Sequence, residues 1–238
     1  MCGRWNALRA LFFVIFCSFS PAAMAAGQSL VMADFVVMSE GHGLTERDNY
    51  DARATPIAAR YGIKRLASLD VLHNFTMKGF KVKRLDLWLL PSVKALQAWG
   101  DDPEYKALLP YRDRVHDMKV TSLYFAHPAM PLRKLGEGHY FIEMFRAGAG
   151  FDRGLFARFK QQSVALGAKY GAAPVAALNI TKKILGKGPM GQRLNLWKLT
   201  SEQQFLAWVR SAEYKALEPM RQRLFDGRSH LMLVGKSR

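Results

Sequence analysis

The sequence has little cysteine and little negative charge. Its two cysteines, Cys2 and Cys17, both lie near the N-terminus, so residues 18–238 hold no disulfide, thiolate nucleophile or cysteine-bound metal. Aspartate and glutamate number 19 against 35 lysines and arginines, which gives a net charge of +16. The positive residues are dispersed, with no continuous basic block interleaved with aromatics. We therefore expect no nucleic-acid partner, whereas binding to an anionic surface of the cell envelope stays open.

The apolar run at the N-terminus is short. It covers 10–16, against the roughly 20 residues of a membrane-spanning helix. Arg4 and Arg9 precede it, and a small-x-small Ala-Met-Ala signal follows, ending at Ala25. This pattern is typical of a secretory signal peptide. We predict cleavage after Ala25, a periplasmic or secreted protein, and no transmembrane segment once 1–25 is removed; an uncleaved anchor is the alternative.

The familiar motifs of cofactor and nucleophile chemistry are missing. The chain has no Gly-rich phosphate loop, dinucleotide fingerprint or Ser–His–Asp elbow. Its histidines are scattered, and no pair has metal-ligand spacing on one helix. We therefore expect no metal and no required cofactor. His73 and His230 lie on predicted strands, so haem ligation by one of them is the alternative.

What the sequence does contain is an internal repeat. Residues 84–114 align without a gap to 193–223, with 16 identities in 31 positions at an offset of 109 residues. The register persists outside this window, since Tyr61-Gly62 falls on Tyr170-Gly171. A fixed period indicates two copies of one structural unit.

Within each copy the apolar period alternates between two and 3.6. Gly62 and Gly171 stand where a helix is expected to end, and Ser92 and Ser201 are predicted helix N-caps. The order of elements in each copy is β-α-β-β-α-β. The predicted strands are 30–38, 64–75, 82–90 and 119–126 in the first copy and 139–145, 172–184, 192–199 and 229–234 in the second.

This order predicts an α+β fold of two tandem ferredoxin-like (βαββαβ) units. Two helices cover only one face of each four-stranded sheet, so we expect the bare faces to pack together as an intramolecular dimeric α+β barrel. The predicted organisation is a signal peptide at 1–25, unit 1 at 26–126, a Pro- and Gly-rich linker at 127–138, and unit 2 at 139–238.

Several phrases resemble proteins of the dimeric α+β barrel superfamily. They are Leu87-Trp88, Ala98-Trp99 and Asp102–Leu108 with their second copies, together with the strand His139–Phe145, which is similar to a NIPSNAP-type first strand. That superfamily holds NIPSNAP-like proteins, antibiotic-biosynthesis monooxygenases and a small domain family of unknown function. The resemblance implies the fold, but relatives range from cofactor-independent oxygenases to haem enzymes, so it does not supply the chemistry.

Polar residues on the predicted strands are the candidate site. If Leu85 and Leu87 face the helices, their neighbours point into the cleft between the two sheets. The candidates for catalysis are Asp34, Asp86 and Arg84, with a carboxylate as base and the arginine as oxyanion partner. The candidates for ligand binding are Trp88, Trp197, Glu143, Arg193, Asn195, His73 and His230. A structural ion pair and plain interface packing are the competing interpretation of both sets.

These observations leave three hypotheses. The first is an exported protein that binds a small aromatic or anionic molecule in the inter-sheet cleft. The second is a cofactor-independent enzyme of monooxygenase or isomerase type, and the third is a basic protein that binds the envelope surface. Neither the identity of the ligand nor the oligomeric state follows from the sequence.

Overall fold

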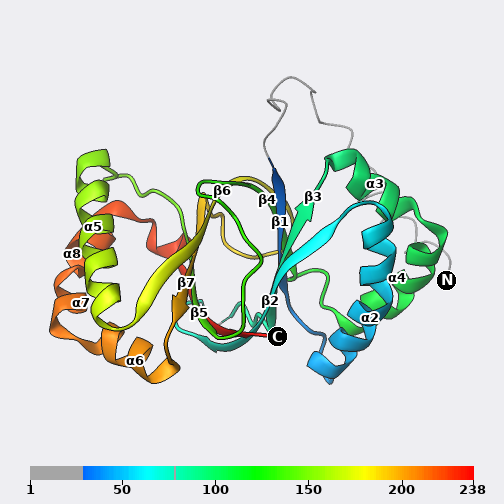
Figure 1. Cartoon of the computed structure of the whole chain (residues 1–238), viewed down its shortest axis with the longest axis horizontal. Coiled ribbons are helices and arrows are strands. Elements are labelled where there is room, and N and C mark those ends of the chain that lie inside the picture. Colours follow the sequence, from blue (N-terminus) through cyan, green and yellow to red (C-terminus); the bar gives the residue numbers. More distant parts are fainter. Residues whose placement is uncertain (1–28, 78) are drawn as a thin grey trace.

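The computed structural model describes residues 29–77 and 79–238 (Figure 1). The predicted signal peptide lies outside these residues. The first half contains β1 (Leu30–Val36), α2 (Leu44–Arg60), β2 (Lys64–Asn74), β3 (Arg84–Leu90), α3 (Val93–Asp101), α4 (Pro103–Val115) and β4 (Ser122–Pro128). The second half contains β5 (His139–Phe145), α5 (Arg153–Lys169), β6 (Ala172–Leu185), β7 (Arg193–Leu199), α6 (Glu202–Arg210), α7 (Ala212–Ala216), α8 (Glu218–Leu224) and β8 (Leu231–Ser237).

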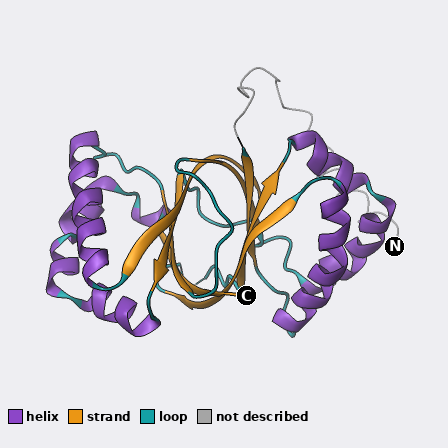
Figure 2. Ribbon diagram, in the orientation of Figure 1, coloured by secondary structure: helices purple, strands orange, loops and turns teal. Residues whose placement is uncertain are grey.

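The eight strands form one closed antiparallel barrel in the order β1-β3-β2-β8-β5-β7-β6-β4. The helices lie in two groups on opposite sides of it (Figure 2). The predicted pair of tandem ferredoxin-like units, with two sheets packed face to face around a cleft, was therefore wrong. β2 pairs with β8 and β4 pairs with β6, so each half closes the other's sheet edges. Closure leaves no unpaired strand edge, which two separate sheets would have exposed.

The barrel interior is filled by the more apolar face of each strand. Leu85 and Leu87 of β3 and Ala33 and Phe35 of β1 belong to this core and are fully buried. The prediction that the two leucines face the helices was wrong, and so was the inward orientation expected for Asp34, Arg84, Asp86, Trp88 and their second-half counterparts. Period-two alternation separates the two faces of a strand but does not say which one turns inward. The barrel core takes aliphatic side chains, and the polar and tryptophan-bearing face lies under the helices.

The predicted ends of the helices are confirmed. Ser92 Oγ accepts from Ala95 N at 3.1 Å at the start of α3, and Ser201 Oγ accepts from Gln204 N at 3.1 Å at the start of α6. Gly62 and Gly171 follow α2 and α5 with φ of 71° and 69°, the left-handed conformation that ends a helix. Within the described residues, no helix is both long and apolar enough to span a membrane.

Candidate functional site

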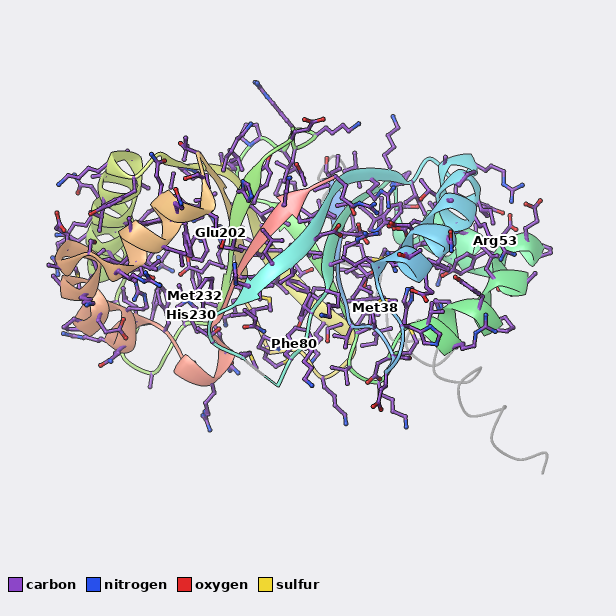
Figure 3. The ribbon with its side chains drawn as sticks, turned by 90° about the horizontal axis from the view of Figure 1, so that it is seen from below. Met38, Arg53, Phe80, Glu202, His230 and Met232 are labelled. Atoms are coloured by element: carbon purple, nitrogen blue, oxygen red, sulfur yellow. The ribbon has the colours of Figure 1, made fainter. Side chains whose placement is uncertain are left out.

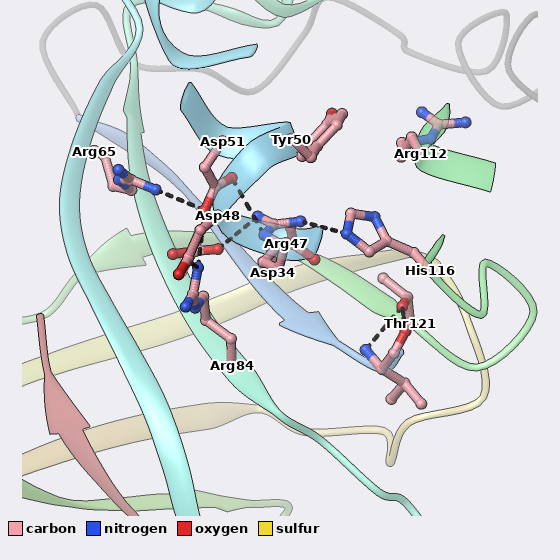
Figure 4. Close-up of polar contacts among 12 residues, drawn as sticks. Asp34, Arg47, Asp48, Tyr50, Asp51, Arg65, Arg84, Arg112, His116 and Thr121 are labelled. Atoms are coloured by element: carbon pink, nitrogen blue, oxygen red, sulfur yellow. Dashed lines mark hydrogen bonds and ion pairs between the residues drawn. The ribbon is translucent and has the colours of Figure 1, made fainter. Parts of the chain in front are cut away.

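Buried charges gather between α2 and the outer face of β1 and β3 (Figure 4). We call this group the α2 charge cluster, and it comprises Asp34, Arg47, Asp51, Arg84, Asp86 and His116. Its geometry follows from local rules. Asp34 of β1 lies opposite Asp86 of β3 in the antiparallel register, so both carboxylates are on the helix side. Arg47 and Asp51 are four residues apart on α2 and therefore share the face turned toward the sheet.

Arg47 is the centre of the cluster. Its Nη2 lies 2.6 Å from Asp86 Oδ2 and 3.6 Å from Asp34 Oδ2, and its Nε lies 3.2 Å from Asp51 Oδ1. The side chain is 3% exposed and that of Asp86 is fully buried. Burial by itself lowers the pKa of Arg47, but the attraction of Asp86, Asp51 and Asp34 outweighs it and raises that pKa. One permanently charged guanidinium thus serves three carboxylates.

A second arginine carries the cluster toward the surface. Arg84 is 1% exposed; its Nη1 lies 3.0 Å from Asp51 and 2.9 Å from Asp48, and its Nε 2.7 Å from Asp70. Arg65 on β2 also contacts Asp51, at 2.9 Å. Asp48 and Asp70 are 34% and 24% exposed, so they form the wet rim of the cluster.

Two groups in the cluster have strongly shifted protonation. Burial raises the pKa of Asp34 to about 7; Arg47 opposes this shift, and the neighbouring Asp86 adds to it. Burial and the nearby arginines lower the pKa of His116 to about 2, so its ring is neutral and its Nε2 accepts from Arg47 Nη1 at 3.4 Å. Asp34 Oδ1 is buried without a hydrogen-bond partner. The cluster therefore holds a carboxyl group that titrates near neutral pH beside a fixed positive charge, as acid–base catalysis requires.

The corresponding region of the second half is mostly aromatic. At the offset of 109 residues, Phe156 stands at the position of Arg47, Phe159 at that of Tyr50 and Phe225 at that of His116. Phe225 packs with Phe145 at a ring separation of 4.3 Å and with Phe159 at 5.3 Å. We call Phe145, Phe156, Phe159 and Phe225 the α5 aromatic cluster.

Four of the predicted second-half residues lie at the edge of this cluster. Glu143 faces Asn195 across β5 and β7 and lies 3.0 Å from His230 Nε2, just before β8 (Figure 3). Arg193 Nε donates to Asn195 Oδ1 at 3.1 Å. These groups are satisfied within the protein.

The remaining candidates are dispersed. Trp88 and Trp197 are buried under the two helical layers, where Trp88 packs with Trp99 and Trp197 with Trp208. His73 lies apart from both groups and contacts Glu202 of α6 at 2.6 Å. The structure thus joins Asp34 with Asp86, but the arginine between them is Arg47 rather than Arg84.

Sequence reasoning missed Arg47, Asp51 and His116. The signal that identifies them is the divergence of the repeat, because the three align with Phe156, Lys160 and Phe225. A buried helix face that carries charge in one copy and phenylalanine in the other marks a position where packing alone does not fix the residue.

Two surface hollows occur in the described part of the chain, and neither is lined by a cluster residue. One, of about 410 Å³, lies between α2 and α4 and is lined by Arg53, Pro56, Ile57, Arg60, Glu104, Ala107 and Leu108. The other, of about 680 Å³, is lined by Arg146, by Ile180–Leu185 of β6 and by Gly186, Met190, Gly191 and Gln192. We call the second the basic hollow.

The histidines do not fit a haem site. His73 Nε2 and His230 Nε2, the ring nitrogens considered for ligation, lie against Glu202 and Glu143 at 2.6 and 3.0 Å. Neither hollow is lined by a histidine. Among the described residues, no group of three His, Cys, Asp or Glu side chains is arranged to hold a metal ion.

A closed antiparallel barrel flanked by helices defines the class of this protein as an α+β barrel. Residues 36–123 match a family model described as Domain of unknown function (DUF1330). Among curated proteins no sequence matches the chain.

Solved structures share the fold at low sequence identity. An anthrone oxidase-like protein is similar over 91% of this chain and 94% of its own, with a TM-score of 0.58 and 13% identity. A mutant chlorite dismutase from Candidatus Nitrospira defluvii, in complex with cyanide, is similar over 90% and 92%, with a TM-score of 0.52 and 9% identity. The family match and the shared fold support the broader resemblance, to the dimeric α+β barrel superfamily. The NIPSNAP likeness and a tandem duplication stay predictions.

Proposed function

We propose that this protein is a cofactor-independent enzyme that removes a proton from a small organic acid at the α2 charge cluster. Asp34 is the acid–base group and Arg47 stabilises the anion that the proton leaves behind. The substrate class is a small, flat molecule with an acidic C–H or O–H group, and the reaction is of monooxygenase or isomerase type. In a monooxygenase the carbanion reduces oxygen directly, and in an isomerase it is reprotonated at another carbon.

One observation carries the proposal. In the second half the equivalent place beneath α5 is packed by Phe156, Phe159 and Phe225 on the same strand register. The fold therefore does not need charge at this place, and a buried ion cluster commonly contributes no more stability than apolar packing of the same volume. A cluster that packing does not require, with one carboxyl titrating near pH 7, is better explained by chemistry.

The residues around Asp34 suit this role. Its side chain is 13% exposed, and its Oδ1 has no hydrogen-bond partner to hold its lone pairs. Arg47 lies 3.6 Å away and stays charged at every working pH. His116 is neutral and does not compete with the substrate anion for the guanidinium as a carboxylate would. The name of the anthrone oxidase-like structure accords with a carbon acid as substrate, and it suggests the probe.

The test uses anthrone, a carbon acid whose oxidation is visible by absorbance and consumes oxygen. We expect the wild type to raise the rate of anthrone oxidation, with the rate increasing through about pH 7 as Asp34 loses its proton. Asp34→Asn should reduce the rate by about a hundredfold or more, the usual contribution of a positioned base. The matched control is Glu143→Gln at the equivalent position of the second half, which should keep the full rate. Equal rates in Asp34→Asn and Glu143→Gln contradict the assignment.

We also propose that the protein is exported, on the evidence of the charged, apolar and small-x-small order before Ala25. The test is N-terminal sequencing of the mature protein from the periplasmic fraction. A first residue of Ala26 is expected, and a chain that keeps residues 1–25 in the cytoplasm contradicts it.

A further inference from the structure

We propose that the basic hollow is a second binding site, for a small amphiphilic organic anion with an apolar body and one acidic head group. It lies in the second half of the molecule, away from the α2 charge cluster, and the proposed enzyme activity does not depend on it. The evidence is the charge of its lining, the apolar residues beside that charge and the rigid loop that holds it.

The lining of the hollow is positively charged and unopposed. Arg146, Lys182 and Lys183 line it, and none of the described lining residues is acidic. Over a longer range, residues 153–201 contain nine lysines and arginines and no aspartate or glutamate. Within the described residues the guanidinium of Arg146 has no ion pair and no hydrogen bond. An arginine in this state is suited to bind a carboxylate, sulfonate or phosphate through two parallel hydrogen bonds.

Apolar side chains lie beside this charge. Ile180, Ile184, Leu185 and Met190 also line the hollow, and Met190 is 53% exposed. Two irregularities in the pairing of β4 with β6 disturb the alternation of β6 here, so consecutive side chains reach the same hollow. Its volume of about 680 Å³ falls in the range of small-molecule sites. Charge next to apolar surface favours an organic anion over inorganic phosphate.

The loop 186–192 is fixed against the end of the barrel. Lys183 Nζ donates to Gly188 O at 2.5 Å, and Gly188 N donates to Ser122 Oγ at 2.7 Å. A Cβ added at Gly191 would lie 2.4 Å from Met144 Cγ, so the backbone here needs glycine. Tyr124 Oη donates to Pro189 O at 2.7 Å. The site is thus formed before a ligand binds, which lowers the entropic cost of binding.

The first half lacks this site. At the offset of 109 residues the three cations correspond to Val37, His73 and Asn74. The copies therefore differ in both directions, since the first half carries buried charge under α2 and the second carries surface charge at the end of β6.

The experiment measures binding of 1-anilinonaphthalene-8-sulfonate, an aromatic sulfonate, by calorimetry and by its fluorescence. We expect one site per chain. Arg146→Val/Lys183→Asn, which installs the first-half residues, should weaken binding by about tenfold or more, as loss of charge-assisted hydrogen bonds predicts. The matched control Arg158→Gln/Lys169→Gln removes the same charge from α5 and should change the affinity less than about twofold, the size of a screened long-range effect.

Three further measurements keep the outcome decisive. Arg146→Val alone removes a side chain with no partners and should fold normally while binding several times more weakly. Inorganic phosphate should not displace the sulfonate, and Asp34→Asn should leave its affinity unchanged, which separates this site from the proposed enzyme. Unchanged affinity in Arg146→Val and in the double variant overturns the site. Binding to phosphatidylglycerol vesicles without binding of the monomeric sulfonate overturns it in favour of a membrane surface.

Discussion

The two halves of the barrel share one backbone plan and fill it differently. Asp34 faces Asp86 in the first half, and Glu143 faces Asn195 in the same register in the second. Beneath α2 the space is occupied by ion pairs centred on Arg47, whereas beneath α5 it is occupied by the α5 aromatic cluster. The difference teaches that the register of the strands, rather than the chemistry beneath the helices, specifies this fold.

The two fillings also differ in energy and in what they can do. Phenylalanine packing is stable by burial and has no protonation state to lose. Buried ions must remain fully paired, because each one left alone costs several kcal/mol. The first half therefore depends on a balance of charges and pH that the second half does not need.

The largest effect is expected when the centre of the charge cluster is replaced by its second-half residue. Arg47→Phe leaves Asp86 and Asp51 buried without their main partner and should cost about 3–5 kcal/mol of unfolding free energy, measured by urea denaturation at pH 7. The variant Arg47→Phe/Asp51→Lys/Asp86→Asn/His116→Phe restores the second-half pattern and should recover most of the loss. A single variant as stable as the wild type would show that the carboxylates do not need Arg47.

Truncating the aromatic cluster should cost nearly as much, but without pH dependence. Phe225→Ala removes a ring that contacts Phe145 and Phe159 and should lose about 3–4 kcal/mol. The loss should be the same at pH 5 and pH 8, because no titrating group changes its charge. A strongly pH-dependent loss contradicts the contrast drawn between the halves.

His116→Phe should remove acid sensitivity from the first half. The folded-state pKa of His116 is lowered to about 2, so only the unfolded chain takes up this proton as the pH falls below about 6.5. Stability is therefore lost on acidification, by about 2 kcal/mol at pH 4.5. The variant should be less acid-sensitive than the wild type by that amount in unfolding curves at pH 7 and 4.5. Parallel curves for the two proteins count against a neutral His116.

Asp34→Asn should have the opposite pH dependence. The folded-state pKa of Asp34 is raised to about 7, so its contribution to stability is present at acidic pH and is lost as the pH rises toward and through 7. Asparagine cannot ionise, so the variant should gain about 1–2 kcal/mol over the wild type at pH 8 and little at pH 5. Direct titration of Asp34 by carbon NMR gives the same answer independently. An ordinary pKa near 4 removes the basis for its role as a base.

The smallest effect is expected at the surface contact between the halves. His73 and Glu202 are 45% and 33% exposed, and exposed pairs contribute little. Glu202→Gln should change stability by less than about 1 kcal/mol, and high salt should shrink even that difference. A loss above this range would show that the halves are joined by this pair as well as by the strand pairing of β2 with β8.

The sequence by itself determined the elements and their order. The 109-residue offset and the alternation between periods of two and 3.6 placed every strand, and Ser92, Ser201, Gly62 and Gly171 marked helix ends through local hydrogen bonds and backbone freedom. Asp34 and Asp86 were recognised because a carboxylate within an apolar strand is conspicuous at any depth.

Only the tertiary structure decided which face of each strand turns inward and how the sheet edges are satisfied. Alternation is symmetric with respect to the two faces, so Leu87 and Trp88 exchange roles with no change in pattern. The choice was made by closure of β2 on β8 and β4 on β6, which creates a barrel interior that aliphatic side chains fill. The same closure put Asp34 and Asp86 beneath α2 and brought Arg47, Asp51 and His116 to them, a meeting of distant residues that no local pattern encodes.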